Sequence, residues 1–546
     1  MHDVLTIDPE GPISVWRNST QPAREVNAKP TSGRVRVLDG GIARRIKQLC
    51  LQLRSGAADA PPPEKGYRDR RQRSSLPRIR TIETKMLETF QSLATTFSNL
   101  AWGPWLLVLL LGGGFFFLVY TRFAPFRHLP HAWDLLRGRY DDENAPGQIS
   151  HFQALSSALA GTIGMGNIAG VALAITIGGP GAIFWMWMTA ILGIATKFFT
   201  CSLAVMYRGK DDAGELQGGP MYVIREALHP RFRFLAYWFA FFGLIGSLPA
   251  LQANQLTQVL RDLLLSEGSL LPASTDPFTF NLTAGLVITV LTASVIFGGL
   301  ARIARVASRL VPAMSALYLG TTLVILMLNL DALPGVISLI ITDAFTGEAV
   351  GGGALLTVIL YGVQRGAFSN EAGLGTESMA HGAAKTNEPI REGLVAMLGP
   401  IVDTLLICTA TASLILISGV WQDGSGMSGV TLTAAAFGSL LGTPGLIALY
   451  TCAICFAITT ILTYSFYGTQ CASFLFGTRS QNAYRWVYVS FIVVASVVSL
   501  NAAISIIDGA YAMMAIPTMT SALLLAPKVK AAAVDYFRRI DTARSP

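Results

Sequence analysis

The chain reads GTIGMGNIAG at Gly161–Gly170 and GAFSNEAGLG at Gly366–Gly375, and each stretch puts glycines and polar side chains inside a long apolar segment. We call them the first and second break. Lipid offers no hydrogen bonds, so irregular backbone at membrane depth is tolerated only where it lines a cavity within the protein. A pair of interrupted segments in corresponding positions of two halves is the best sequence indicator of a transporter's binding site. The two breaks therefore predict a two-halved membrane fold with a central site.

The rest of the chain has the composition of a membrane protein. It is 52% hydrophobic and only 14% charged, whereas typical soluble domains carry about 25% charged residues. Apolar runs such as Trp102–Tyr120 approach the ~20 residues that cross a bilayer as a helix. We therefore expect an all-α polytopic membrane protein.

Eleven segments are expected to cross the membrane. They cover residues 102–121, 150–176, 181–206, 235–260, 281–299, 310–329, 354–376, 393–419, 446–475, 485–503 and 505–526. The first segment belongs to a peripheral N-terminal helix region, 86–122, and the other ten form two five-helix blocks, 150–329 and 354–526. Each block begins with a broken helix, and an odd number of helices turns the second block over, giving a 5+5 inverted repeat. The apolar stretch Val430–Leu441 is too short to span and is expected to form a re-entrant or surface helix.

Basic residues predict the orientation of these segments. Loops 122–148 and 207–234 carry four and five Lys or Arg, whereas loops 266–279 and 330–353 carry none. Because Lys and Arg concentrate in cytoplasmic loops, the alternation puts the C-terminal tail, 527–546, in the cytoplasm. With eleven spans the N-terminus would lie outside.

Residues 1–85 form a separate basic tail. They hold seventeen Lys/Arg against nine Asp/Glu, and because the remainder holds twenty-four of each, the formal net charge of +8 belongs to the tail. Such composition is typical of disorder. Basic residues concentrate on the cytoplasmic side, so a basic tail on the outer side is unexpected. Either the tail is translocated across the membrane or the native chain begins at Met86, which is the preferred interpretation. The tail has neither the features of a nucleic-acid-binding segment nor the apolar run of a signal peptide.

Local unwinding is expected at the first break. Gly161, Gly164 and Gly166 each cost roughly 1 kcal/mol relative to alanine in a helix, and Thr162 and Asn167 add polar side chains. Unwinding frees amide N–H groups, and the following helix points its positive N-terminal end at the same place. This geometry suits a substrate carboxylate, and a lone Asn facing lipid is too costly for a packing role alone.

The second break adds an aromatic ring and an acid. Phe368 is expected either to wall a small apolar pocket or to pack in the core. Glu371 lies at membrane depth, where an acid should be paired or face water. It either neutralises Arg365, the preferred interpretation, or titrates in a proton-coupled cycle.

Two later segments offer further polar candidates. Gln252 would accept the ammonium group of a substrate or bond a neighbouring helix, with Asn254 and Gln255 as alternatives. Thr459 and Thr460 offer hydroxyls that, with freed carbonyls, would suit a small dehydrated cation. Threonines that bond back to their own helix are the common alternative.

The remaining reactive residues indicate neither a metal centre nor an enzyme. Cys452 and Cys455 form a single Cys-x-x-Cys pair without nearby histidines, and the six histidines form no spaced cluster. No His/Asp/Glu or Ser/Lys constellation is seen at membrane depth, which argues against an intramembrane enzyme. Lys197, inside the third segment, would snorkel to the interface or pair with an acid such as Asp403.

Several motifs resemble those of the alanine/glycine:cation symporters. GGPGAIFWMWMTAILG at Gly178–Gly193, ATKF at Ala195–Phe198 and GGPMYVI at Gly218–Ile224 are similar to that family, as are both breaks. The resemblance runs over residues 102–530. It implies the LeuT-type fold of the amino acid–polyamine–cation-type superfamily, with sodium-driven uptake of alanine or glycine in a prokaryotic cytoplasmic membrane.

The resemblance also implies roles for individual residues. The substrate would be held by Thr162, Gly164, Asn167, Gln252, Phe368, Ser369 and Asn370. The sodium ion would be held by the backbone carbonyls of Ala160 and Ile163 and by the hydroxyls of Thr459 and Thr460. No cofactor and no metal beyond sodium is implied. Thr200 departs from the family, which usually has an acid after ATKF, so the partner of Lys197 stays open.

A secondary active symporter, embedded in membrane lipid, is the leading functional hypothesis. The alternatives are a proton-coupled symporter of another small neutral amino acid and a non-transporting amino-acid sensor on the same scaffold. A sensor usually needs an added signalling domain, which the tails do not supply. Alanine and glycine stay equal candidates, and the oligomeric state is not indicated.

Overall fold

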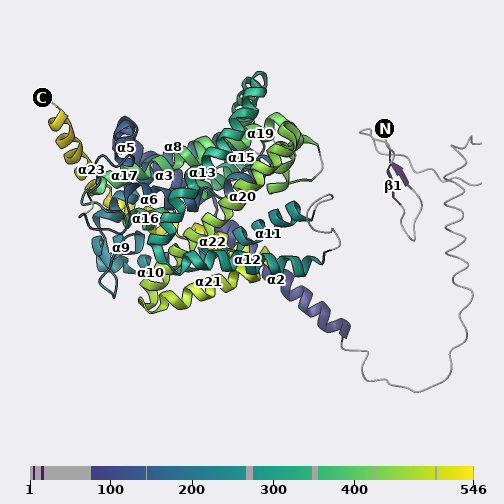
Figure 1. Cartoon of the computed structure of the whole chain (residues 1–546), viewed down its shortest axis with the longest axis horizontal. Coiled ribbons are helices and arrows are strands. Elements are labelled where there is room, and N and C mark those ends of the chain that lie inside the picture. The colour runs from purple at the N-terminus through teal and green to yellow at the C-terminus, as the bar shows by residue number, and fades with distance from the viewer. Residues whose placement is uncertain are drawn as a thin grey trace, which may run out of the picture. The chain divides into compact units, whose positions relative to one another are not determined.

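The computed structural model describes residues 4–6, 14–16, 76–142, 144–265, 275–346, 355–423, 426–498 and 501–544 (Figure 1). The chain divides into two units, Met1–Ile79 and Arg80–Pro546. In the first unit, strand β1 (Val4–Thr6) pairs antiparallel with β2 (Ser14–Trp16). Apart from these strands and the first turns of α2 (Leu76–Ala101), the disorder expected for residues 1–85 concerns positions outside the described ranges.

Helices make up almost all of the second unit. Eight of its described helices are long and apolar enough to cross a membrane, and a ninth span is counted if one bent pair is a single span. A short hairpin of β3 (Gly209–Lys210) and β4 (Leu216–Gln217) also lies in this unit. The multi-pass helical fold is thus confirmed. The count is below eleven partly because the second break divides its segment into two short helices, and the eleven spans stay a prediction.

The bent pair coincides with the first break. α6 (His151–Thr162) begins with a capping box, in which the side chains of Ser150 and Gln153 each accept from the other's backbone amide. After Thr162 the chain bends by 51°. It continues as the π-helix η1 (Gly166–Gly170) and as α7 (Val171–Gly178).

The second break separates α15 (Leu355–Asn370) from α16 (Thr376–Gly382). Between them, Glu371 has φ +57°, Gly373 has φ +85° and Gly375 has φ +93°. These left-handed conformations are incompatible with a continuous right-handed helix, and glycine adopts them at little cost. Two glycines of the sequence motif, Gly373 and Gly375, therefore occupy positions with left-handed backbone conformations.

Another expected boundary lies within α20 (Gly429–Phe476). Its backbone is non-helical at Gly442, with φ +63° and ψ −149°, and Pro444 follows. Two helices therefore meet there, and the first corresponds to the short stretch expected at Val430–Leu441. Its relation to the membrane stays a prediction.

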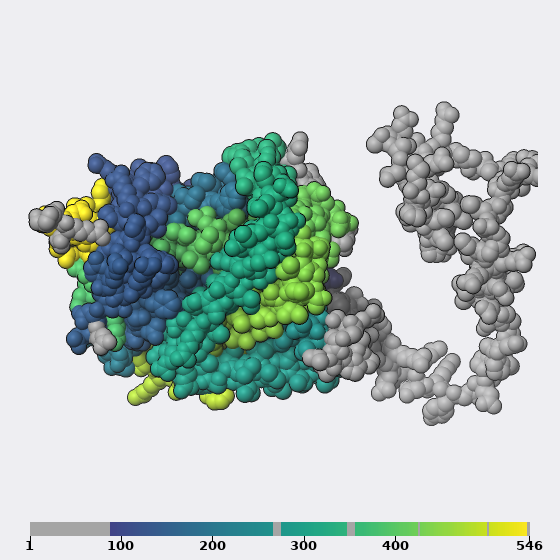
Figure 2. Space-filling model, turned by 45° about the horizontal axis from the view of Figure 1, so that its top comes forward, coloured from purple at the N-terminus to yellow at the C-terminus, as the bar shows by residue number. Residues whose placement is uncertain are grey.

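Three regions are more helical than expected. α13 (Gly299–Leu328) begins eleven residues before the predicted span at 310–329. α14 (Leu333–Thr346) fills much of loop 330–353. α23 (Ala515–Arg544) extends through most of the C-terminal tail. Figure 2 shows the teal and green stretch of α13 and α14 crossing one face of the second unit diagonally.

The other described helices complete the bundle. They are α3 (Pro104–Tyr120), α4 (Ala124–Arg127), α5 (Leu129–Leu136), α8 (Ala182–Met206), α9 (Pro220–Ala227), η2 (Pro230–Phe232), α10 (Arg233–Gly246), α11 (Ala250–Leu264), α12 (Pro277–Ile296), η3 (Leu330–Ala332), α17 (Pro389–Ala396), α18 (Leu398–Pro400), the π-helix η4 (Ile401–Cys408), α19 (Thr409–Ser418), η5 (Val420–Gln422), α21 (Ser480–Val497) and α22 (Asn501–Met513). In the most apolar stretch of α8, 89% of residues are buried, against 28% in α12. α8 is therefore a core helix, and α12 turns most of its surface outward.

Candidate functional site

The Asn167 side chain accepts a hydrogen bond from a backbone amide that the first break frees. The amide of Gly164 would bond the carbonyl of Ala160 in a continuous helix, but it donates to Asn167 Oδ1 at 2.8 Å. The backbone turns back at the same point, because the Asn167 amide donates to Gly164 O at 3.1 Å. An asparagine carbonyl thus replaces a helical acceptor, and the Ala160 carbonyl is left without that helical donor.

The other end of the Asn167 side chain joins both breaks to η4. Its Nδ2 donates to Asp403 Oδ1 at 2.6 Å and to Ser369 Oγ at 3.3 Å. Ser369 and Thr404 each donate a hydroxyl hydrogen to Asp403 Oδ2, at 2.8 and 2.7 Å. We call Asn167, Ser369, Asp403 and Thr404 the Asp403 cluster. All four residues are at most 1% exposed, so the cluster is a buried link between three elements.

The acid of the second break has different partners from those expected. Glu371 accepts hydrogen bonds from Thr376 Oγ1 at 2.5 Å and from Tyr464 OH at 3.1 Å. The preferred pairing with Arg365 is wrong: no Glu371–Arg365 ion pair is present, and the Arg365 guanidinium lies 6.0 Å from the centre of the Phe368 ring. The reason is geometric, since residues six apart on a helix lie on different faces and Glu371 lies beyond the end of α15.

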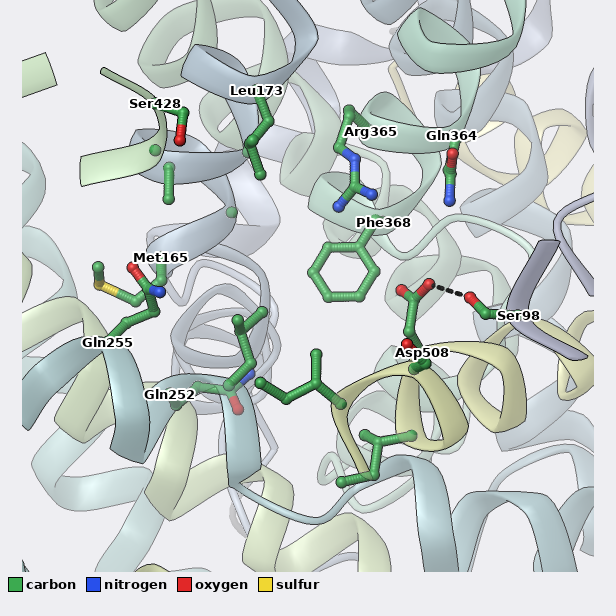
Figure 3. A pocket seen from close by; sticks show the side chains of 18 of the residues that line it. Ser98, Met165, Leu173, Gln252, Gln255, Gln364, Arg365, Phe368, Ser428 and Asp508 are labelled. Carbon is green, nitrogen blue, oxygen red and sulfur yellow. Dashed lines mark hydrogen bonds between the residues drawn. The ribbon is translucent and has the colours of Figure 1, made fainter. Parts of the chain in front are cut away.

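A large cavity of about 750 Å³ lies beside the breaks (Figure 3). It is lined by Met165 and Gly166 from the first break, Phe368 from α15, Gln252 and Gln255 from α11, and Tyr511 from α22, among others. Of the predicted substrate residues, Gln252 and Phe368 therefore line the cavity. Thr162, Gly164, Asn167, Ser369 and Asn370 do not line it.

The predicted substrate residues that do not line the cavity have structural contacts instead. Thr162 donates back to Leu159 O at 3.4 Å, and Asn370 Oδ1 accepts from the Ala372 amide at 3.0 Å. Asn167 and Ser369 belong to the Asp403 cluster. Gly164 packs so closely on α20 that a Cβ atom added there would lie 2.6 Å from Thr460 Oγ1.

The predicted cation ligands are only partly brought together. Thr460 abuts the first break at Gly164, and its hydroxyl donates to Phe456 O at 2.9 Å. Thr459 donates to Cys455 O at 2.9 Å, and its hydroxyl lies 3.8 Å from the sulfur of Met314 on α13. Both threonines thus make the back-bonds considered as the alternative. Ala160 and Ile163 are buried at the end of α6, next to the bend.

Lys197 lies deep in the protein. It is 1% exposed, so it does not snorkel, and it forms no ion pair within 4.0 Å in the described part of the chain. The nearby Thr200 donates to Glu377 Oε1 at 3.2 Å. Thr200, where the sequence resemblance led us to expect an acid, therefore bonds an acid from α16, Glu377.

A second buried cluster joins the start of α6 to α16 and α17. His151 Nδ1 bonds Glu392 Oε2, and His381 Nδ1 bonds Glu392 Oε1 at 2.5 Å. Arg208 donates to the carbonyls of Gly382 at 2.7 Å and of Pro146 at 3.0 Å, and also to those of Ala384 and Thr386. We call His151, His381, Glu392 and Arg208 the inner latch, because the charge pattern predicts this end to be cytoplasmic. Among the described residues, no group of three or more His, Cys, Asp and Glu could hold a metal ion.

Comparison with known proteins decides the family. Residues 87–546 match the model of the sodium:alanine symporter family. The chain belongs to that family. Membership puts this multi-pass membrane protein among the sodium-coupled amino-acid symporters and outside the enzymes.

Individual relatives in the sodium:alanine symporter family cover most of the chain. The sodium/alanine symporter AgcS of Methanococcus maripaludis is 40% identical over 440 residues, which are 80% of this chain and 95% of that protein. An uncharacterized transporter of Haemophilus influenzae is 40% identical over 83% of this chain and 97% of its own length. The probable sodium/glutamine symporter GlnT of Bacillus subtilis is 33% identical over 82% of this chain and 91% of its own length.

The fold of this member of the sodium:alanine symporter family is similar to that of a solved structure. The crystal structure of MhsT in complex with L-phenylalanine aligns with a TM-score of 0.54 at 15% identity, over 71% of this chain and 93% of MhsT. At that identity the likeness concerns the fold alone. It supports the expected LeuT-type architecture.

Proposed function

We propose that the chain is a secondary active transporter that couples sodium movement to the uptake of alanine or glycine by alternating access. One observation carries the proposal: Asn167 of the first break bonds Ser369 of the second break, beside a cavity lined by Gly166 and Phe368 from the same two elements. A ligand in that cavity would touch both interrupted helices, so its binding can favour one arrangement of the two halves over another.

The architecture proposed for this transport is the eleven-span form of the fold. One peripheral helix region, 86–122, precedes two five-helix repeats, 150–329 and 354–526, of opposite orientation. The two bent or divided segments at their starts support this division. The charge pattern supports a cytoplasmic C-terminus. The location in a prokaryotic cytoplasmic membrane is proposed from the family resemblance.

The substrate site is proposed where the first break meets the cavity. Backbone amides around Gly166 would hold the carboxylate, Gln252 would accept the ammonium group, and Phe368 would cover the side chain. Thr162, Gly164, Asn167, Ser369 and Asn370 would shape this site from behind the cavity surface. Asn167 and Ser369 are well suited to that role because the Asp403 cluster fixes both of them.

The sodium site is proposed behind the same break. The carbonyls of Ala160 and Ile163, with the hydroxyl of Thr460, offer hard oxygen ligands at the end of α6, and Thr459 would add a fourth after a change of rotamer. A sodium ion entering a negative interior gains about 2.3 kcal/mol per 100 mV. That gain can drive accumulation of a neutral zwitterion carried in the same cycle.

Proteoliposomes test the proposal directly. Labelled alanine or glycine should accumulate under an imposed inward sodium gradient with a negative interior, and vesicles without protein should show none. Uptake under a proton gradient alone would select the proton-coupled alternative and point to the acids at depth, among them Glu371. No uptake under either gradient, together with specific binding of alanine, would select the sensor.

A further inference from the structure

The large cavity contains two opposite charges. Among the described residues that line it, Arg365 and Asp508 are charged and all others are neutral. Figure 3 shows both charged groups near the Phe368 ring, with Arg365 coming from α15 and Asp508 from α22. Yet no salt bridge within 4.0 Å joins them in the described part of the chain. Both charges therefore face a shared space without neutralising each other in direct contact.

The position of Asp508 is fixed by a helix that lies outside the proposed repeats. Ser98 on α2 donates to Asp508 Oδ2 at 2.7 Å, and Trp102 Nε1 donates to Asp508 O at 3.2 Å. Thr95, Ser98 and Asn99 of α2 also line the cavity. α2 is thus more than a peripheral span, because it forms part of the cavity wall and orients one of its two charges.

The opposite wall is polar but uncharged. Gln252, Gln255 and Gln258 follow one another at intervals of three along α11, on one side of that helix, and all three line the cavity. The volume of about 750 Å³ lies within the ~300–1,000 Å³ of pockets for much larger ligands than alanine. There is consequently room for a substrate near the charged wall as well as at the first break.

We propose that Arg365 and Asp508 form an outer recognition site for zwitterionic amino acids, occupied before the substrate reaches the first break. Arg365 binds the α-carboxylate, for which a planar guanidinium offers paired donors, and Asp508 binds the α-ammonium group. The glutamine wall faces the side chain and accommodates small polar as well as apolar ones. This proposal rests on the proposed transport function.

The charge pattern of the loops predicts that the cavity faces the outer side. Gly426–Thr431 contributes to its rim and belongs to loop 420–445, which carries no Lys or Arg and is predicted to be extracellular. The inner latch lies on the predicted cytoplasmic side. An outer site should therefore affect substrate arriving from outside and have little effect on substrate arriving from the cytoplasm.

Transport measured from each side tests this asymmetry. In right-side-out vesicles with a sodium gradient, Arg365→Gln and Asp508→Asn should each raise the alanine concentration for half-maximal uptake by about 10-fold, the effect of losing one charge-assisted contact. In inside-out vesicles the same variants should shift that concentration by less than about 2-fold. The matched controls are Arg305→Gln and Asp331→Asn, which alter exposed side chains outside the cavity.

A ligand analogue tests the assignment of each charge. Alaninamide keeps the ammonium group and lacks the carboxylate, so Arg365→Gln should weaken inhibition by alanine but not inhibition by alaninamide. Asp508→Asn should weaken both. If Asp508→Asn is poorly inserted, Ser98→Ala, which removes only the hydroxyl that holds the carboxylate, should show the same asymmetry at about 3-fold.

Three results would overturn the outer site. These are equal shifts from both sides, no shift from either side, and a fall in maximal rate without a change in half-saturation, which would make the two residues part of the moving structure. Absence of uptake by the unaltered chain would instead refute the transport function itself, so the two failures are distinguishable.

Discussion

The Asn167 side chain donates to the Asp403 carboxylate at 2.6 Å, which ties the first break to the π-helical segment η4. The two residues are 236 positions apart in the sequence. π-helical turns often mark functional sites, and here one presents a buried acid to both interrupted helices. The Asp403 cluster therefore connects both breaks to η4, and we expect the proposed transport cycle to depend on it.

Replacing Asp403 should weaken the hydrogen bonds that connect the first and second breaks through this residue. In Asp403→Asn, one acceptor oxygen becomes an NH₂ group that faces buried donors, at a cost of about 1–3 kcal/mol for each unsatisfied group. We expect uptake of labelled alanine to fall at least tenfold while the protein still inserts. Asp331→Asn, an exposed change, is the control, and uptake that is equal in both variants would contradict the role of the cluster.

The close approach of α20 to the first break predicts a steric effect. Gly164→Ala would bring a Cβ atom to 2.6 Å from Thr460 Oγ1, so it should displace a proposed sodium ligand and raise the sodium concentration for half-maximal uptake. Gly112→Ala is the matched control, because a Cβ atom at Gly112 meets no atom within 4 Å. In the double variant Gly164→Ala/Thr460→Ala, thermal stability should recover while sodium dependence stays impaired. Recovery of both properties would remove Thr460 from the sodium site.

The inner latch should control opening toward the cytoplasm. Both carboxylate oxygens of Glu392 bond a histidine, one to His151 and one to His381. Glutamine has a single acceptor oxygen, so Glu392→Gln loses one of these bonds and should destabilise the closed inner end by about 1–3 kcal/mol. Arg208→Gln removes donors to four carbonyls and should act in the same direction. A cysteine placed at the buried Ser157 should then react faster with thiol reagents added on the cytoplasmic side. Arg127→Gln, which changes an exposed side chain, should leave that reaction rate unchanged. An equally slow reaction in all variants would show that the inner latch does not restrict access from the cytoplasmic side.

The N-terminal tail should be dispensable. The family match begins at residue 87, so a chain that starts at Met86 should take up alanine at the rate of the full chain. Initial rates normalised to the amount of inserted protein check this expectation. A large loss of rate would assign a role to residues 1–85, and N-terminal sequencing of the native protein would show whether they are present.

Sequence reasoning located the interrupted helices because their cause is local. Glycines and an asparagine in an apolar run lower helix stability wherever they occur, and the 51° bend lies at the predicted place. Gln252 and Phe368 were also identified. Gln252 is a polar side chain midway along an apolar span, and Phe368 is an aromatic residue inside the second break. Both of them line the cavity.

The parts that sequence reasoning missed depend on which helix faces which. Asp403 was named only as a possible partner of Lys197, because its bonds to Asn167 and Ser369 arise from packing between distant segments. Likewise, His151 and His381 share Glu392 although the three positions follow no short motif. Arg365 was paired with Glu371 from proximity along the chain, whereas the left-handed turn at Glu371 directs that acid to Thr376 and Tyr464.

Coupled flux is the most direct test of the central claim, that both breaks act together on sodium and an amino acid. Proteoliposomes held at a negative interior should take up labelled sodium faster when alanine is added outside, and Asn167→Ala should abolish this stimulation. Sodium entry that does not respond to alanine or glycine, in vesicles that accumulate the amino acid, would contradict the account.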